Sequence, residues 1–168
     1  MTELKKIESP GIYLQEVVAM FREYSIELNE NIDFQDFNKE LADPLLKYGP
    51  PSGALFIAVH EGTPAGCIAL HALDGKEICE MKRLYVRPAF RSHSIGIKLC
   101  DALIRKAKEM NYKVMVLDTL KRLKPAISLY KRLGFRDTEP YYSNPLKDVV
   151  YMRKELTEHE DGILADSK

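Results

Sequence analysis

One stretch of the chain constrains the fold more than any other. Apolar residues dominate Glu77–Val86, which stops at Arg87-Pro88, and a polar loop follows. A long amphipathic helix is predicted next, from about Ile95 to Met110, because its apolar residues recur at helical spacing. Val114–Leu117 then has the composition of a short buried strand. Strands that meet helices in this order predict an α/β fold with a mixed sheet.

The flanking segments are predicted to belong to the same single domain. Ser9-Pro10 indicates the start of a helix, with Pro10 in its first turn. Asp33 is expected to cap a second helix that ends near Pro44, and residues 43–53 are expected to form a Pro- and Gly-rich loop. The remaining elements expected are strands over Leu4–Ile7, Ala54–Val59, Ala65–Leu70, Phe135–Thr138 and Val149–Arg153, and a helix over Pro125–Leu133 closed by Gly134. Apolar helix faces are expected at Val17, Met20, Phe21 and Tyr24, and at Phe34, Phe37 and Leu41. We expect one domain over residues 1–156 and a frayed tail over 157–168.

The charges are segregated along the chain, although 25 Lys and Arg residues balance 25 Asp and Glu residues. Residues 1–81 carry 6 basic and 14 acidic side chains, residues 82–136 carry 15 and 3, and residues 137–168 carry 4 and 8. A basic middle between acidic flanks predicts a polyanionic ligand, either a phosphate-bearing cofactor or a nucleic acid. The alternative is a set of solvated helix faces.

Several classes of protein are disfavoured by composition. Residues 1–11 lack the apolar region of a signal peptide, and no apolar run approaches the ~18 residues of a membrane span. The cysteines at 67, 79 and 100 show no CxxC spacing, so neither a disulfide framework nor a metal site is expected. His60 and His71 have no second ligand at metal-binding spacing. We therefore expect a cytoplasmic protein that needs no metal and no membrane.

The loop before the long helix has the chemistry of an anion site. It consists of Arg91, Ser92, His93, Ser94, Ile95 and Gly96. A helix start presents unbonded N–H groups to an anion, and Gly96 allows close approach to the backbone. On these residues alone, a packing role for Gly96 is the alternative.

With its neighbours, this loop resembles the GNAT superfamily of N-acetyltransferases. Arg91–Gly96 stands for the family's Arg/Gln-x-x-Gly-x-Gly/Ala pyrophosphate motif, with Ser94 in place of the first glycine. Ala126–Phe135 matches the family's Ala-x-x-Leu-Tyr-x-x-x-Gly-Phe pattern, while Leu123 replaces a frequent Asn. The resemblance extends from about Ala54 to Arg153. It implies a GNAT-like mixed central sheet flanked by helices.

The resemblance also implies a reaction and a cosubstrate. Such an acyltransferase moves an acetyl group from acetyl-CoA directly to a primary amine in a ternary complex. The backbone of Leu84, Tyr85 and Val86 would pair with the pantetheine arm, and the loop Arg91–Gly96 would hold the pyrophosphate. The negative charges of coenzyme A would account for the basic middle without any nucleic acid.

Two side chains are implied to be catalytic. Tyr130 would protonate the leaving thiolate; the alternative is a core tyrosine packed under Gly134 and Phe135. Glu80 lies eleven residues before Arg91, the spacing of the glutamate that deprotonates the amine through water in the histone-modifying branch of the family, so the resemblance implies the same role here. A carboxylate partly buried in a sheet would have the raised pKa that a base needs; the alternative is a structural ion pair with a nearby Lys or Arg. Tyr141–Pro145 is an aromatic, polar loop that either shapes an acceptor pocket or covers the sheet edge.

Two rival functions remain open at this stage. One is a GNAT-like module that binds acyl-CoA with little activity, since a fold does not fix function. The other is a nucleic-acid-binding domain, against which the zero net charge and the absence of recognised motifs both argue. The acceptor is expected to be a small-molecule amine. The sequence leaves the oligomeric state open, a homodimer included.

Overall fold

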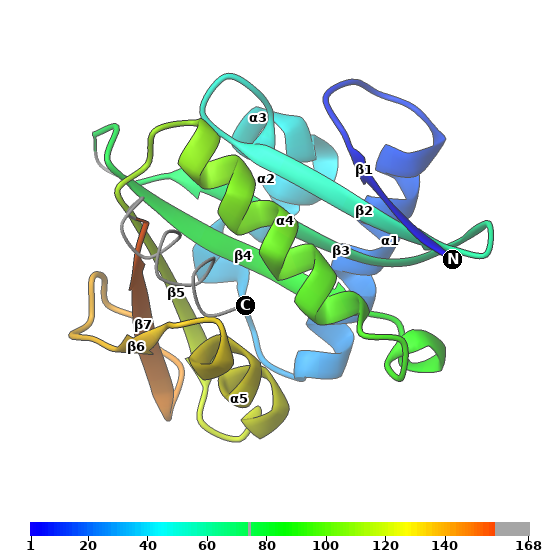
Figure 1. Ribbon diagram of the computed structural model, residues 1–168. Helices are drawn as coiled ribbons and strands as arrows, with labels where there is room; N and C mark the ends of the chain where they lie inside the picture. Colours follow the sequence, from blue (N-terminus) through cyan, green and yellow to red (C-terminus); the bar gives the residue numbers. More distant parts are fainter. Residues whose placement is uncertain (74, 157–168) are drawn as a thin grey trace. The chain divides into compact units, whose positions relative to one another are not determined.

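The computed structural model describes residues 1–73 and 75–156 (Figure 1). The strands are β1 Thr2–Lys6, β2 Ala54–His60, β3 Thr63–Ala72, β4 Ile78–Val86, β5 Val114–Leu120, β6 Arg136–Asp137 and β7 Val149–Glu155. The helices are α1 Ile12–Leu28, α2 Phe37–Ala42, α3 Pro44–Tyr48, α4 Ile95–Glu109 and α5 Lys124–Arg132, with 3-10 turns η1 Asp33–Gln35 and η2 Pro88–Phe90. The tail expected at 157–168 lies outside the described residues.

All seven strands belong to one sheet, in the order β1-β2-β3-β4-β5-β7-β6. Strands β1, β2 and β3 pair antiparallel, β4 pairs parallel with β5, and β5, β7 and β6 pair antiparallel. The sheet is therefore mixed, as the order of strands and helices predicted. The boundary expected at residue 156 remains a prediction.

Contacts within the chain divide it into two compact units. The first unit comprises Met1–His71 and Met81–Leu103; the second comprises, among the described residues, 72–73, 75–80 and 104–156. Strand β4 contributes to both, because Ile78, Cys79 and Glu80 pair with β5 in the second unit.

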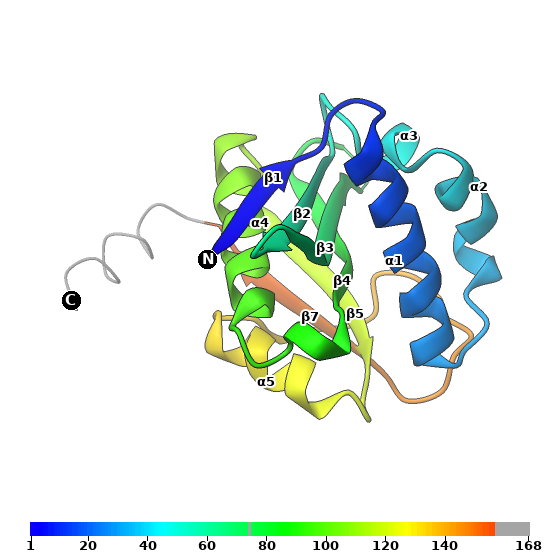
Figure 2. The ribbon, with the colours of Figure 1, turned by 90° about the vertical axis from the view of Figure 1, so that its right-hand side faces the viewer.

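In the first unit, helices cover both faces of the strands. Figure 2 shows α1, α2 and α3 on one side of β1–β3 and the first part of α4 on the other. Strands β2 and β3 are buried along most of their length, which is why they are near-continuous apolar runs and do not alternate. The α1 face predicted to be apolar is confirmed at Val17, Met20 and Phe21, all fully buried.

Three predictions about the elements of this unit are wrong. Helix α1 begins at Ile12, after Pro10, because Gly11 is extended and serves as its N-cap. The single helix expected after Asp33 is broken, since Asp36 adopts a left-handed φ of 56° between η1 and α2. Part of the expected loop over 43–53 is helix α3, for which Pro44 is a favourable first residue.

A further consequence is that Phe34 does not join the apolar face expected for it. Its side chain is 40% exposed, whereas Phe37 is buried.

The second unit consists of β5, β7 and β6 with the start of β4, and α5 lies next to them (Figure 1). Residues Val114–Leu120 pair with Val149–Glu155 along the whole of β5. The predicted end of α5 at Gly134 is confirmed, because Gly134 follows the helix with φ 95°, a conformation that other residues rarely adopt.

Candidate functional site

The predicted cofactor loop is an exposed turn between η2 and α4 in the first unit. Residues 91–94 form the turn, and α4 begins at Ile95, so Gly96 lies in the first helical turn. Ser94 has a φ of 58°, in the left-handed region. This explains why the related motif carries glycine there, since glycine adopts that conformation without strain. The first N–H groups of α4 have no partner within the helix and are suited to an anion.

His93 of this turn stacks on a histidine from β2. The rings of His93 and His60 lie 4.3 Å apart at an interplanar angle of 26°. Desolvation and the nearby His93 lower the pKa of His60. The stack ties the turn to the end of β2.

The end of β4 precedes the turn and packs tightly against β3. Tyr85 is buried, while Leu84 and Val86 are partly exposed. A Cβ built on Gly66 of β3 would lie 2.8 Å from the Tyr85 carbonyl oxygen, so the two backbones can approach only because this residue is glycine.

The most buried cation of this unit is Arg83, on β4. Its Nε and Nη2 donate to Glu40 of α2 at 2.6 and 3.2 Å, and Tyr48 Oη donates to the same carboxylate at 2.9 Å. Burial works against ionisation of Glu40, but the charge and hydrogen bonds of Arg83 outweigh it, so the pKa of Glu40 is below its ordinary value. Arg83 also has a φ of 61°, which is unusual within a strand.

Two more arginines near the turn face glutamates of α1. Arg87 donates to both oxygens of Glu23, at 3.0 and 2.8 Å, and Arg91 Nη2 lies 2.7 Å from Glu27. Arg91 Nε also donates to the Val86 carbonyl oxygen. Arginines of the basic segment 82–136 therefore pair with glutamates of the acidic segment 1–81 within this unit. A count of charges along the sequence did not reveal this pairing.

In the second unit, the predicted base Glu80 lies at the start of β4. Its side chain is buried, and its carboxylate accepts a hydrogen bond of 2.5 Å from Tyr141 Oη. Burial, then the charge of Glu80, raises the pKa of the Tyr141 hydroxyl, which therefore stays protonated as a donor. The structure thus joins Glu80 to the aromatic loop that the sequence singled out.

A second carboxylate, Asp118 of β5, was not predicted. It accepts hydrogen bonds from Tyr142 Oη and from Asn144 Nδ2, the latter at 2.8 Å. Tyr151 Oη donates to the Tyr142 carbonyl oxygen at 3.0 Å. The signal available in the sequence was an acidic residue at the end of an apolar strand together with three polar aromatic residues downstream.

Tyr130, the predicted acid, lies on α5. It is buried, and its ring makes an edge contact with Phe135 at 5.9 Å between centroids. This contact agrees with the alternative of a core tyrosine packed under Gly134 and Phe135. A catalytic role for the Tyr130 hydroxyl stays a prediction.

The cysteines have the character of buried apolar residues. Cys67, Cys79 and Cys100 are free and buried. Burial raises the pKa of Cys79 and of Cys100 to about 12, and that of Cys67 further. All three thiols are neutral near pH 7, which does not suit an acyl-enzyme nucleophile.

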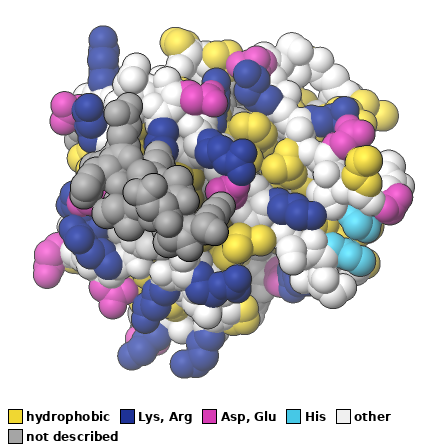
Figure 3. All heavy atoms as spheres, in the orientation of Figure 1, with side chains coloured by type: hydrophobic (Ala, Val, Ile, Leu, Met, Phe, Trp, Pro, Cys, Tyr) yellow, Lys and Arg dark blue, Asp and Glu magenta, His cyan; other side chains and the backbone are white. Residues whose placement is uncertain are grey.

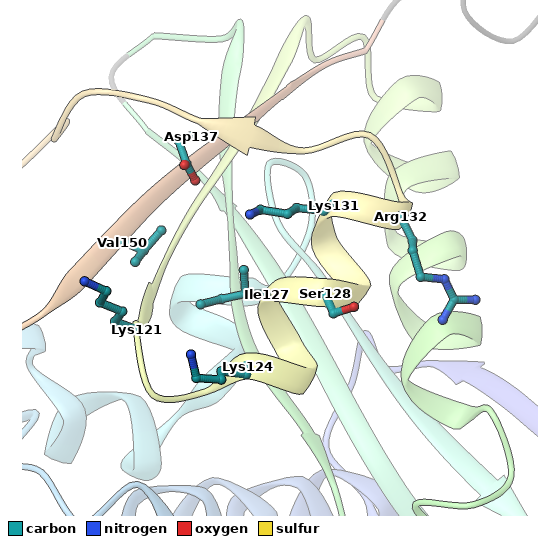
Figure 4. Close-up of a pocket in the computed structure, with 8 residues that line it drawn as sticks. All are labelled: Lys121, Lys124, Ile127, Ser128, Lys131, Arg132, Asp137 and Val150. Atoms are coloured by element: carbon teal, nitrogen blue, oxygen red, sulfur yellow. The ribbon is translucent and has the colours of Figure 1, made fainter.

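A pocket of about 700 Å³ in the second unit was not predicted from the sequence. Figure 4 shows the side chains of Lys124, Ile127 and Lys131 extending from α5 toward the strands, with Arg132 on the other side of the helix. On the face drawn in Figure 3, basic side chains gather where Figure 1 places α5. The lining residues are Lys121, Lys124, Ile127, Ser128, Lys131, Arg132, Asp137 and Val150. With one carboxylate among four cations, this pocket favours an anion.

Within residues 1–73 and 75–156, no group of three or more His, Cys, Asp or Glu side chains is arranged to hold a metal ion. In the same part of the chain, no helix has the length and apolar character required to cross a bilayer.

Known proteins are similar to this chain in sequence and in fold. The family described as Acetyltransferase (GNAT) matches residues 14–135. An uncharacterized N-acetyltransferase of Schizosaccharomyces pombe is 46% identical over 145 residues, which cover 86% of this chain and 89% of that protein.

Solved structures agree with this assignment. A GNAT-family acetyltransferase of Staphylococcus aureus superposes with a TM-score of 0.75 at 25% identity, over 92% of this chain and 100% of that chain. An aminoglycoside 6'-N-acetyltransferase complexed with coenzyme A gives a TM-score of 0.72 over 92% of this chain and 97% of that chain, at 15% identity, which shows the fold alone. The family match spans most of the chain, and the predicted fold is confirmed. The protein therefore belongs to the GNAT acetyltransferase family and is an acyltransferase.

Proposed function

We propose that this enzyme transfers the acetyl group of acetyl-CoA to a primary amine of a small molecule, in a ternary complex in the cytoplasm. The observation that carries the proposal is the turn at residues 91–94 leading into α4, in a chain of this family. Unbonded N–H groups at the helix start and the hydroxyls of Ser92 and Ser94 fit the phosphates of a coenzyme. An aminoglycoside acetyltransferase of the same fold, complexed with coenzyme A, supports both the cosubstrate and the small amine.

The reaction needs one base and one acid. The amine nitrogen must be neutral to attack the thioester carbonyl, so Glu80 accepts its proton. A C–N bond then forms as the C–S bond breaks, and the electron pair of that bond goes to sulfur. Tyr130 donates its hydroxyl proton to the thiolate, and the second proton, which nitrogen loses as the amide forms, restores the Tyr130 hydroxyl through solvent. Glu80 releases the first proton to solvent, so the products leave as the amide and the free thiol.

Coenzyme binding is tested by thermal unfolding. At a hundredfold excess over its dissociation constant, acetyl-CoA should stabilise the fold by about 2.7 kcal/mol. A Gly96→Glu variant should remain folded and lose this stabilisation through steric clash and charge. A melting temperature unchanged by acetyl-CoA but raised by short DNA would favour the nucleic-acid alternative instead.

Turnover is tested by thiol release with a panel of small amines. Tyr130→Phe should lower kcat by roughly 10²–10⁴-fold while leaving acetyl-CoA affinity nearly unchanged, because the hydroxyl acts mainly as thiolate charge develops. Binding of acetyl-CoA without turnover of any amine would identify a coenzyme-binding module. A variant with normal kcat, in an enzyme limited by chemistry, would show that Tyr130 is a packing residue.

A further inference from the structure

Two adjacent tyrosines of the loop between β6 and β7 bond carboxylates on two different strands. Tyr141 Oη donates to Glu80 Oε2 at 2.5 Å, and Tyr142 Oη donates to Asp118 Oδ2. Glu80 belongs to β4 and Asp118 to β5. All four residues lie in the second unit. The loop therefore makes specific polar contacts with the sheet.

Strand register places the acceptors on one face of the sheet. Glu80 is opposite Val116 in the parallel pair of β4 and β5, and residues opposite each other project to the same side. Asp118 follows Val116 by two residues and so shares that side. Tyr151 of β7 is opposite Asp118 and therefore projects to the same side.

The loop is fixed by contacts that do not involve Glu80. Asn144 Nδ2 donates to Asp118 at 2.8 Å, and Asn144 Oδ1 accepts from the Leu146 N–H at 2.9 Å. The ring of Tyr151 lies 5.4 Å from that of Tyr141 and 5.9 Å from that of Tyr142. Because Asp118 and Tyr151 anchor the loop, the Tyr141 hydroxyl arrives at Glu80 already oriented.

We propose that Tyr141 is a positioning residue of acetyl transfer, which holds Glu80 as a carboxylate in one orientation toward the amine. The proposal rests on the proposed function, in which Glu80 is the base. A hydrogen bond to the charged form of an acid favours that form, so Tyr141 keeps the base ionised at lower pH than burial alone would allow.

Other charged groups share this side of the sheet with Glu80. Lys82 follows it by two residues on β4 and is buried, and Arg153 of β7 is opposite Val116. Both cations also favour the ionised carboxylate, and both are unchanged in the Tyr141 variants tested below.

The Cys79 thiol is a buried neutral neighbour on β4. Asp118 of β5 is a like charge, which opposes ionisation. Tyr142 and Tyr151 donate to Asp118 and to a backbone oxygen respectively. The bond from Tyr141 is thus the contact in the loop that favours the ionised base.

The experiment is the pH dependence of kcat/KM for the full chain with its best amine, in wild type, Tyr141→Phe, Tyr142→Phe and Glu80→Gln. A hydrogen bond to a charged group is strong enough to change a pKa by about one unit. Tyr141→Phe should therefore move the acid limb of the profile to higher pH by about one unit, with little change at the alkaline end. Tyr142→Phe removes a hydroxyl from the neighbouring residue and should leave the limb in place, because Asn144 still bonds Asp118.

The outcomes distinguish failure of the positioning role of Tyr141 from failure of the proposed acetyl transfer with Glu80 as base. Absence of turnover with every amine, or a Glu80→Gln enzyme with the wild-type profile, would contradict the proposed function. If Glu80→Gln removes the limb but Tyr141→Phe does not move it, or moves it no more than Tyr142→Phe, the role of Tyr141 is overturned.

A second probe covers the case in which Tyr141→Phe does not fold. A 3-fluorotyrosine incorporated at position 141 is nearly isosteric and has a more acidic hydroxyl, which strengthens the bond to Glu80. Because the stronger bond favours the carboxylate, the acid limb should move to lower pH by roughly a few tenths of a unit. A limb that stays at its wild-type position would also overturn the proposal.

Discussion

In the first unit, arginines of β4 and of the following turn face glutamates, whereas in the second unit lysines around α5 line an open pocket. Arg83, Arg87 and Arg91 each lie within 3.0 Å of a carboxylate oxygen. The side chain of Arg83 is 2% exposed, that of Arg87 22% and that of Arg91 45%. The same type of pair thus occurs in three different dielectric surroundings.

The pocket of the second unit has the opposite character. Lys121, Lys124, Lys131 and Arg132 are exposed, and none forms an ion pair within residues 1–73 and 75–156. Asp137 is the one acidic residue among those that line the pocket. All these cations belong to the basic segment 82–136 that the sequence presents as one block.

This difference shows that one basic segment can have two physical roles, pairing that stabilises the fold and attraction of an anion. Where a cation is buried, its pairing is a matter of stability, because an unpaired buried charge is strongly unfavourable. Where cations are exposed and unpaired, their field attracts an anion and adds little to stability. Variants in each region should therefore change different measurements.

The largest effect is expected at the buried pair. Glu40→Ala leaves Arg83 buried without its carboxylate and should lower the free energy of unfolding by about 3–5 kcal/mol. Urea titration of the variant measures this. The double variant Glu40→Leu with Arg83→Met removes both charges and should recover most of the loss. A single variant within 1 kcal/mol of wild type, on the order of an exposed pair, would remove the distinction between buried and exposed arginines.

The same pair predicts a loss of stability in acid. The pKa of Glu40 is lower in the fold than its ordinary value of 4.5. Its stabilisation is therefore complete above that value and is lost as the pH falls through the folded-state pKa. Melting temperatures of wild type and of the Glu40→Leu, Arg83→Met variant should converge between neutral pH and the acid range. Parallel curves would show that Glu40 does not contribute to acid unfolding.

At the pocket, the expected change is in binding. The double variant Lys124→Glu, Lys131→Glu should lower the affinity of the pocket for inorganic pyrophosphate by at least about tenfold at low salt. Each change replaces an attraction to the anion by a repulsion. Titration calorimetry at low and high salt measures this, and the difference should shrink as salt screens the charges. Lys113→Glu, an exposed change outside the pocket lining, is the control. Equal affinity in all three proteins would show that the pocket has no preference for anions.

The smallest effect is expected at the exposed pair of Arg91 and Glu27. Glu27→Ala should change the free energy of unfolding by less than about 1 kcal/mol, because water screens both side chains. The same urea titration, repeated at 1 M salt, should bring variant and wild type together. A loss as large as that of Glu40→Ala would place Arg91 with the structural arginines.

The sequence by itself determined the order and type of most elements. Hydrophobic periodicity identified α4, and the pattern from Ala126 to Phe135 identified α5 and its end at Gly134, because these signals are local to the chain. Predicted boundaries were wrong where a single backbone angle set the true one. At Asp36, for example, a left-handed φ interrupts the helix expected there. The family and its fold also followed from short-range motifs.

Only the tertiary structure decided which charges are paired and which polar groups meet. Arg83 bonds a residue 43 positions away, and Tyr141 bonds one 61 positions away. No local pattern encodes such partners, since they depend on strand register and on which helix covers a face. The sequence displayed a single basic segment, and folding divided it, because glutamates of α1 and α2 reach β4 and the turn after it, while the lysines lining the pocket at α5 form no ion pair with a described residue.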